Sequence, residues 1–225
     1  MINGAILERL GSIVGRENVH SGAAQLIAYS YDATFQQGSP DVVVSPSCVE
    51  EVSQILRLAN AESMAVITRG AGTGLAGGTI PTKGGIVLNL ARMNRILEVD
   101  QANAMARVQA GVVTADLQKA VEAKGYFYPP DPASVHQCTI GGNVACNAGG
   151  TRCLKYGVTR DYVVGVTVVL ADGRVLTWGG KLRKNSGGYN LAQLFVGSEG
   201  TLGVVVETTL RLIPLPKSRA TASAY

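Results

Sequence analysis

Apolar positions recur along the chain with two different spacings, and the spacing separates predicted helices from predicted strands. Residues 2–14 place Ile6, Leu10, Ile13 and Val14 on one face of a helix. Short continuous or alternating apolar runs predict strands instead. These runs lie at residues 42–45, 65–68, 86–90, 96–99, 105–109, 162–170, 174–178 and 203–213.

Capping residues mark two further helices. Ser47 is predicted to cap one of them, because Glu50 follows three residues later, as in a capping box. Thr114 is predicted to cap the other, which Gly125 closes. Residues 126–161 show no clear period and few charges, so they are predicted to form a long irregular segment. Long ordered loops of this kind are usually functional.

The order of these elements predicts an α+β fold. The regular strand–helix–strand alternation of a doubly wound sheet does not persist along the chain. Ala171-Asp172-Gly173 separates two apolar runs and predicts a β-hairpin. We expect two lobes, the first over residues 1–100 and the second over residues 101–225.

Composition narrows the class of protein. The chain has 225 residues, of which 46% are hydrophobic and 16% charged, which excludes a disordered chain. The 20 basic residues against 16 acidic ones are scattered, which argues against a nucleic-acid binder. No apolar run approaches the roughly 18 residues of a membrane span. Glu8 and Arg9 interrupt any secretory signal, so the expected location is the cytoplasm and the four cysteines are expected as free thiols.

Glycine is the unusual component, with 28 residues, and seven of them lie between Gly70 and Gly85. Glycines at this density allow the backbone to turn and to point successive N–H groups inward, which makes an anion-binding concavity. A plain glycine-rich turn is the alternative. Residues 72–77 match GxGxxG, but Pro81 follows instead of a helix, so a dinucleotide-binding Rossmann loop is excluded. The prediction is a strand–loop–strand cradle of backbone amides without a helix terminus.

Two more glycine clusters follow, at residues 128–150 and 195–203. The first is rich in small residues and amides, which suits close backbone approach to a flat polar heterocycle; a tightly packed internal loop is the alternative. Asp131 and Glu199 are acids in these loops, and either a loop-ordering hydrogen bond or a cofactor contact explains them. The spacing of His136 and the nearby cysteines matches no common metal frame, so no metal site is predicted.

Six motifs in order give the chain a specific resemblance. They are Arg69-Gly-Ala-Gly-Thr-Gly, Pro129-Pro-Asp-Pro, Ile140-Gly-Gly-Asn-Val with Asn147-Ala-Gly-Gly, Leu154-Lys-Tyr-Gly, Gly188-Tyr-Asn-Leu and Val196-Gly-Ser-Glu-Gly-Thr-Leu-Gly. Together they resemble the flavin-binding domain of the vanillyl-alcohol oxidase/p-cresol methylhydroxylase class. Within that class they are similar to the 2-hydroxy-acid branch: the FAD subunit of glycolate oxidase and the FAD-dependent D-lactate and D-2-hydroxyglutarate dehydrogenases.

The resemblance implies two α+β subdomains with FAD bound between them. It implies that the loop at 70–74 holds the pyrophosphate, that residues 130–150 line the isoalloxazine and ribityl chain, and that Gly157 and residues 199–205 lie near the adenine half. The implied cofactor residues are Gly70, Ala71, Gly72, Thr73, Gly74, Leu75, Pro130, Asp131, Ser134, Thr139, Gly141, Gly142, Asn143, Asn147, Gly149, Gly150, Gly157, Glu199, Gly200, Val204 and Val205.

The resemblance also sets expectations about chemistry and partners. Some members attach FAD through a histidine in the first loop, where this chain has Thr73, so non-covalent FAD is expected. The implied substrate is a 2-hydroxy acid whose hydride passes to flavin N5. Further subunits, one of them an iron–sulfur electron acceptor, are implied, and with them peripheral attachment at the inner membrane.

Relatives of this kind carry a C-terminal substrate or cap domain, and this chain stops at Tyr225, where that domain would begin. The domain is therefore expected to be absent, and no catalytic residue is assigned. The alternative function is a stand-alone FAD-binding module or subunit without its own turnover.

Overall fold

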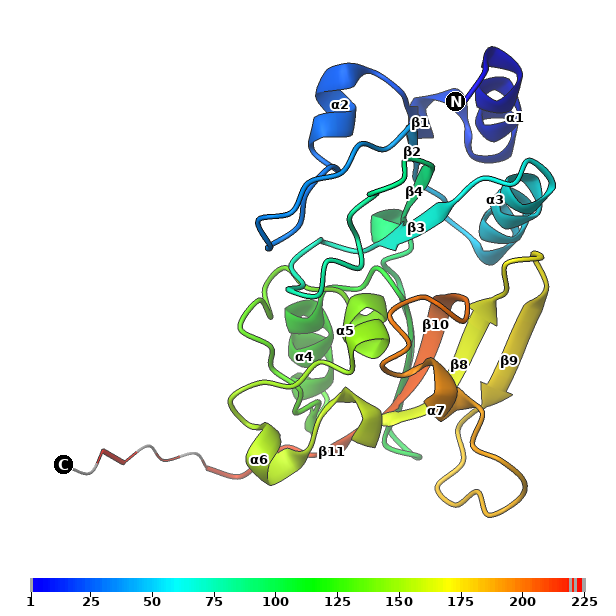
Figure 1. The fold of residues 1–225 in the computed structure, drawn as a ribbon. Helices are drawn as coiled ribbons and strands as arrows, with labels where there is room; N and C mark the ends of the chain where they lie inside the picture. The colour runs from blue at the N-terminus through cyan, green and yellow to red at the C-terminus, as the bar shows by residue number, and fades with distance from the viewer. Residues whose placement is uncertain (1, 219, 221, 224–225) are drawn as a thin grey trace.

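The computed structural model describes residues 2–218, 220 and 222–223. The described residues build a four-stranded and a five-stranded sheet, one above the other in Figure 1, with helices packed beside each, and a separate two-stranded sheet. This is the predicted α+β class, and the predicted apolar runs each overlap a strand, whereas the two-residue strands at Val19–His20 and Tyr126–Phe127 were not predicted. The 3₁₀ turns are Arg16–Asn18, Leu90–Arg92 and Thr159–Asp161.

The first sheet has four strands. Its order is β1 (Val19–His20), β2 (Val42–Val44), β4 (Ile86–Asn89) and β3 (Val66–Arg69). β2, β4 and β3 run parallel, and β2 and β4 are fully buried, which explains why they read as short continuous apolar runs. The helices of this half are α1 (Gly4–Val14), α2 (Ala23–Ile27) and α3 (Val49–Ala61).

The second sheet is antiparallel throughout. Its order is β5 (Ile96–Asp100), β6 (Met105–Gln109), β10 (Val204–Arg211), β8 (Val163–Val169) and β9 (Val175–Gly179). The predicted β8–β9 hairpin is confirmed, with Val169 opposite Val175. The remaining elements are α4 (Thr114–Glu122), α5 (Ile140–Cys146), α6 (Cys153–Tyr156), α7 (Ala192–Phe195) and the pair β7 (Tyr126–Phe127) with β11 (Ile213–Pro214).

The chain passes from the first sheet to the second between Asn89 and Ile96. β5 therefore pairs with the second sheet, although it lies inside residues 1–100. The division into subdomains at residue 100 stays a prediction.

Three local predictions are wrong. α3 begins after Cys48, and the Ser47 N–H donates to Glu51 Oε2 (2.6 Å) instead of pairing with Glu50, because Ser47 lies one residue before the N-cap. Thr114 is the first residue of α4 and not its cap.

The third wrong prediction concerns residues 126–161, which are not irregular throughout. They contain α5, which starts at the N-cap Thr139 and ends at Asn147 in the left-handed conformation. Gly141 and Gly142 lower the helix propensity of this segment and hide its period. Gly141 is required there by packing, since a Cβ atom would lie 2.6 Å from the Cβ of Ala110.

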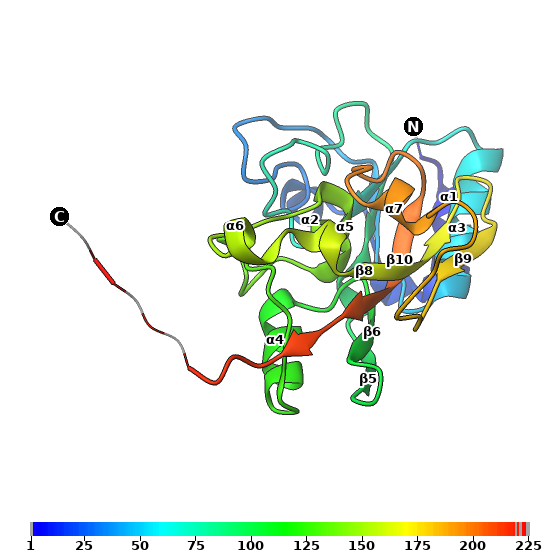
Figure 2. The ribbon, with the colours of Figure 1, turned by 90° about the horizontal axis from the view of Figure 1, so that it is seen from below.

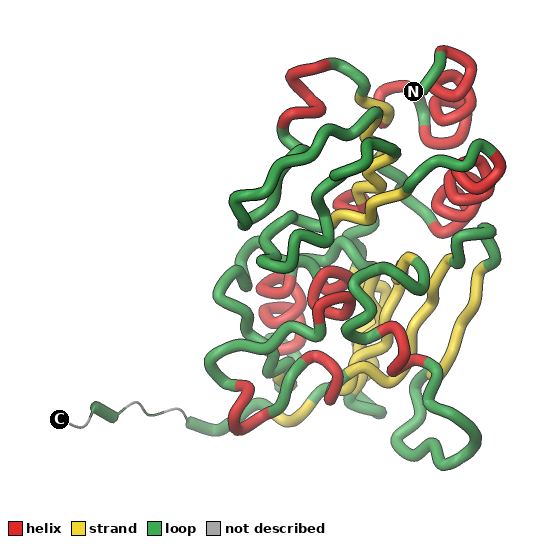
Figure 3. The backbone as a smooth tube through the Cα atoms, viewed as in Figure 1, coloured by secondary structure: helices red, strands yellow, loops and turns green. Residues whose placement is uncertain are grey.

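The core joins the two halves. α1, β2, α3 and β4 pack into one apolar cluster, and this cluster also contains Val169, Val204 and Val206 from the second sheet. The Ser53 hydroxyl of α3 donates to the carbonyl of Gly173 in the β8–β9 turn (2.6 Å). A second cluster lies within the second half, between its sheet and the helices α4, α5 and α7. On the other side of the molecule, long loops gather where the two sheets meet, green in Figure 3.

Candidate functional site

A pocket lies between the two halves. Its enclosed space and its open mouth together amount to about 740 Å³. Its lining comes from the loop after β3, from the first turns of α5 and from the segment before β10. The pocket therefore draws on all three glycine clusters of the sequence.

The loop after β3 forms one wall. Gly72 adopts φ +68°, a conformation that side chains other than glycine rarely take. A Cβ atom at Gly72 would also collide with the guanidinium of Arg69. Glycine is thus required here both by the backbone conformation and by what lies beneath it.

Arg69 supports this loop from below. Its side chain is buried, and its Nη1 donates to the carbonyl oxygen of Tyr31 (2.7 Å). Its guanidinium lies 5.5 Å from the ring centre of Tyr29, within cation–π range. Burial lowers the pKa of Arg69, while Tyr29 and Asp32 act in the opposite direction. Arginine keeps its charge under such shifts, so a cation lies behind the loop.

The backbone N–H groups of this loop are available to a ligand. Within the described residues, no N–H from Ala71 to Gly78 donates a hydrogen bond to the protein. Backbone donors are strong and are normally paired with protein, water or ligand. A run of unpaired donors on a curved glycine-rich loop suits an anion.

The start of α5 closes the opposite wall. A Cβ atom at Gly70 would collide with the Thr139 hydroxyl, so the end of β3 and the start of α5 are in close contact. Gly141 and Gly142 of the first turn line the pocket. The N–H groups of this first turn are already paired: Ile140 donates to the carbonyl of Val112 (2.9 Å), Gly141 to that of Ala110 (2.7 Å) and Gly142 to the Thr139 hydroxyl (3.4 Å). That the cradle works without a helix terminus stays a prediction. The helix comes from a segment about 70 residues farther along the chain, which the local sequence around the loop does not reveal.

The charged side chains lining the pocket are both carboxylates, Asp32 and Glu199. Cys146 lines it as well, and burial raises the pKa of its thiol, with Glu199 adding to the effect. This thiol is therefore protonated at neutral pH and is not set up as a nucleophile. All four cysteines are free.

The structure brings together some of the residues implied by the resemblance. Those lining the pocket are Gly70, Gly74, Thr139, Gly141, Gly142, Glu199, Gly200 and Val205. Ala71, Gly72, Thr73 and Leu75 belong to the same loop without appearing in the lining.

Other implied residues lie outside this lining, and their role as cofactor contacts stays a prediction. They are Pro130, Asp131, Ser134, Asn143, Asn147, Gly149, Gly150, Gly157 and Val204. Several have partners within the protein. Asp131 pairs with Arg152 (Oδ2 to Nε, 3.1 Å), and the buried Asn143 donates to the Thr114 hydroxyl (2.7 Å). Asn147 accepts from the backbone N–H of Arg160 (2.9 Å).

Sequence reasoning missed several lining residues. The most informative is Asp32, together with Thr79 from the far end of the glycine loop. Asp32 followed two residues later by Thr34 is an Asx-turn pattern, which was a usable signal for an ordered carboxylate. Nothing in the chain order indicated that it would face the loop after β3.

The described residues contain no group of three or more His, Cys, Asp or Glu side chains placed to hold a metal ion. No helix among them is long and apolar enough to cross a bilayer.

The known proteins similar to this chain are of the kind that the sequence motifs resemble. Residues 40–179 match the family described as FAD binding domain. The chain is 51% identical over 225 residues to "Glycolate oxidase subunit GlcD" of Bacillus subtilis, covering all of this chain and 48% of that protein. It is 45% identical over 186 residues to "D-lactate dehydrogenase" of Anaerostipes hadrus, covering 83% of this chain and 39% of that protein.

Among solved structures, p-cresol methylhydroxylase with substrate bound aligns with a TM-score of 0.80 at 21% identity, over 95% of this chain and 44% of that one. At this identity the likeness shows the fold alone. The chain spans about half the length, or less, of the curated relatives that it matches.

Proposed function

Because the chain belongs to the family described as FAD binding domain, we propose that it is the FAD-holding part of a flavin-dependent D-2-hydroxy-acid dehydrogenase. The relatives named as glycolate oxidase subunit and D-lactate dehydrogenase support this substrate class. The observation that carries the proposal is the row of unpaired N–H groups from Ala71 to Gly78 at the pocket between the two halves.

The residues present fit this cofactor. A pyrophosphate needs donors, and the loop offers backbone donors backed by the buried Arg69, while the carboxylates of Asp32 and Glu199 lie toward the far end of the loop, near Thr79 and Gly78. A Cβ atom at Gly74 would meet no protein atom within 4 Å, so the chain leaves open space along this wall. The loop would hold the pyrophosphate, and the segments beginning at Thr139 and Glu199 would hold the remainder.

We propose that the cofactor is held without a covalent bond. The position of the linking histidine in related flavoproteins is occupied here by Thr73, whose hydroxyl is not a comparable nucleophile. Backbone donors, packing and polar side chains then carry the whole affinity.

When bound, FAD supplies two-electron hydride acceptance, which is the redox chemistry of the reaction. The chain's own task is to bind and orient it. The described residues that line the pocket include no histidine, and we give its two carboxylates no role in proton transfer, so we assign no catalytic residue here. The base and the cation for the substrate carboxylate would come from another part of the protein or from a partner.

Partners follow from the same proposal. The small-molecule partner would be a D-2-hydroxy acid, and an iron–sulfur subunit would accept the electrons. The reaction would take place in the cytoplasm, with attachment to the inner membrane through such partner subunits as the alternative.

A stand-alone FAD-binding module is the second candidate. It is favoured by the pocket itself, which among the described residues offers backbone donors and no histidine. The two candidates differ in whether the chain alone reduces its flavin with substrate.

One experiment tests these points in sequence. The purified chain is mixed with FAD, freed of unbound flavin, and its absorption spectrum is recorded before and after D-lactate is added without oxygen. We expect bound flavin that is not bleached. Bleaching would show a working dehydrogenase in this chain alone, and failure to retain flavin would contradict the proposal. Denaturing the loaded protein is expected to release all flavin; colour remaining with the polypeptide would contradict non-covalent binding.

A further inference from the structure

Asp32 is a buried carboxylate in the pocket wall, and neither the motifs nor the predicted cofactor residues include it. Its side chain lines the pocket, while only 8% of the residue is exposed. Lys, Glu, Arg and Asp are almost never buried to this degree without partners. Its two oxygens are used differently, and that difference indicates what the carboxylate does.

One oxygen is committed to the protein. Oδ1 accepts from the backbone N–H of Thr34 (2.8 Å) and from its hydroxyl (2.7 Å). These two short bonds form an Asx turn and fix the orientation of the carboxylate. The other oxygen, Oδ2, has one long contact, from the Thr79 hydroxyl at 3.4 Å. Because 3.4 Å is beyond the usual range for an O–H donor, Oδ2 has acceptor capacity left for a molecule in the pocket.

Charge decides what kind of group that is. Asp32 and Glu199 are the charged side chains among the lining residues, and both are acids. A phosphate placed against Oδ2 would bring like charges together in a partly desolvated site. A hydroxyl is neutral and donates a hydrogen bond, which a carboxylate accepts strongly. The carboxylate therefore favours the sugar part of a flavin dinucleotide and disfavours its phosphates.

We propose that Asp32 Oδ2 accepts a hydrogen bond from a hydroxyl of the cofactor, on either its ribityl chain or its ribose. Asp32 thereby fixes the position of the cofactor along the pocket. Its charge repels the pyrophosphate, which binds the N–H groups of Ala71–Gly78 instead. The charge of Arg69 interacts favourably with that of Asp32. This inference rests on the proposed FAD site.

The variant Asp32→Asn separates this role from a purely structural one. Asparagine keeps an oxygen for the Thr34 turn and replaces the second oxygen with an uncharged amide. If Oδ2 binds a hydroxyl, FAD affinity falls by about tenfold, since a charge-assisted hydrogen bond is replaced by a neutral one. If Asp32 only orders the turn, affinity is unchanged. If it faces the pyrophosphate, affinity rises because a repulsion is removed. Either of the last two results overturns the proposal.

The measurement is calorimetric titration of FAD into the apo-chain, with thermal unfolding of each apo-variant to show that it is folded. Should Asp32→Asn fail to fold, the wild-type chain is titrated with FAD analogues that each lack one ribose or ribityl hydroxyl, and we expect one of them to bind about tenfold more weakly than FAD. Equal affinity for all of them would overturn the proposal. Titration with ADP identifies the hydroxyl. If Asp32→Asn weakens the affinity for both ADP and FAD, the hydroxyl belongs to the ribose. If it weakens the affinity for FAD alone, the hydroxyl belongs to the ribityl chain.

Asp41→Asn is the matched control. Its Oδ2 accepts from the backbone N–H of Gly85 (2.8 Å), so it also orders a loop of the first sheet, but it does not line this pocket. We expect its FAD affinity to equal that of the wild type. If the wild-type chain binds FAD and Asp32→Asn binds it equally well, this inference fails alone. If the wild-type chain does not bind FAD, the proposed function fails first.

Discussion

At the residue scale, the glycine loop depends on a side chain that lies beneath it. Arg69 ends β3, turns back under Gly72 and holds the carbonyl of Tyr31 at 2.7 Å. Its charge is too deeply buried to act as an exposed phosphate clamp, so it works by supporting the loop. The donors offered to a ligand are those of the backbone, and their arrangement depends on this packing.

This arrangement predicts the effect of Gly72→Val. Valine cannot adopt φ +68° without strain, and its side chain would displace Arg69. We expect FAD binding to be abolished while the apo-protein stays folded. Flavin content after purification measures the first effect and circular dichroism the second.

Gly125→Val is the control for backbone strain alone. Gly125 has φ +79° and a Cβ atom there meets nothing within 4 Å, and it lies outside the pocket. We expect this variant to lose stability and keep its flavin. Near-normal flavin content in Gly72→Val would contradict the role of the loop.

At the element scale, the helices and strands that local sequence determines could be predicted, and those that depend on tertiary contacts could not. β2, β4 and the β8–β9 hairpin were predictable, because burial on both faces and a turn sequence leave local marks in the chain. α5 was not, because its Gly141 serves a close contact with Ala110 that only the folded chain creates. The glycine loop was predictable as a donor surface, whereas its opposite wall was not.

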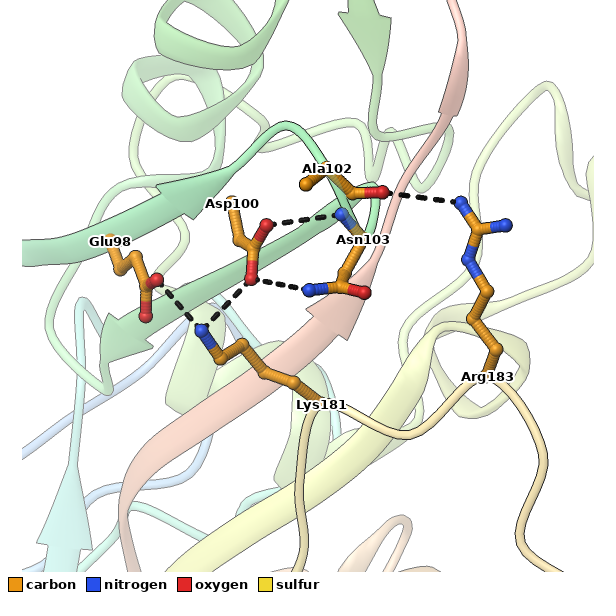
Figure 4. A network of polar contacts seen from close by, with 6 residues as sticks. All are labelled: Glu98, Asp100, Ala102, Asn103, Lys181 and Arg183. Atoms are coloured by element: carbon orange, nitrogen blue, oxygen red, sulfur yellow. Dashed lines mark hydrogen bonds and ion pairs between the residues drawn. The ribbon is translucent and has the colours of Figure 1, made fainter.

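The loop between β9 and α7 is fastened by an exposed network, shown in Figure 4. Lys181 Nζ lies 2.8 Å from Glu98 Oε1 and 2.9 Å from Asp100 Oδ2. Asp100 also accepts from the backbone and side chain of Asn103. The Asn103 side chain first, and Lys181 next, hold the pKa of Asp100 well below its usual range.

We therefore expect Asp100→Asn to loosen this loop at neutral pH. Trypsin cleavage after Lys181, Arg183 or Lys184 should quicken by roughly two- to fivefold, the range expected for loss of an exposed ion pair. Mass spectrometry of early fragments measures the rate. The lowered pKa of Asp100 also predicts a pH dependence. The ionised carboxylate stabilises the folded state at pH values above its unfolded-state pKa, and this stabilisation is lost as the pH falls through its folded-state pKa.

Glu207→Gln provides the comparison. Glu207 pairs with Arg107 at 3.8 Å on the same sheet without contacting the loop. Trypsin should cleave the loop between β9 and α7 in Glu207→Gln at the same rate as in the wild-type protein. Equal rates in Asp100→Asn and Glu207→Gln would show that the network does not hold the loop.

At the scale of the whole molecule, the two halves are joined on one side and separated by the pocket on the other. The apolar cluster around α3 includes Val169, Val204 and Val206, so the sheets share a core there. Figure 1 shows α3 above the turn between β8 and β9, and Figure 2, seen from below, shows α5 and α6 on the opposite side of the molecule. The pocket takes its walls from both halves. A ligand in it therefore connects segments that the core does not hold together.

This geometry predicts that FAD stabilises both walls at once. At a free FAD concentration about 100 times its Kd, binding adds about 2.7 kcal/mol to the free energy of unfolding. For a chain of this size that corresponds to a rise in Tm of about 5–10 °C. Gly72→Val should show no rise, which separates binding from a general effect of the additive.

Hydrogen exchange then locates the stabilisation. FAD should slow exchange in the loop at 70–79 and, to a similar degree, in the segment at 199–205, which lies more than a hundred residues away in the chain. The free N–H groups of Ala71–Gly78 exchange fast without ligand because no protein acceptor protects them. Protection of one segment without the other would mean that FAD rests on a single half. The position between the two sheets, and with it the subdomain arrangement proposed for this chain, would then be wrong.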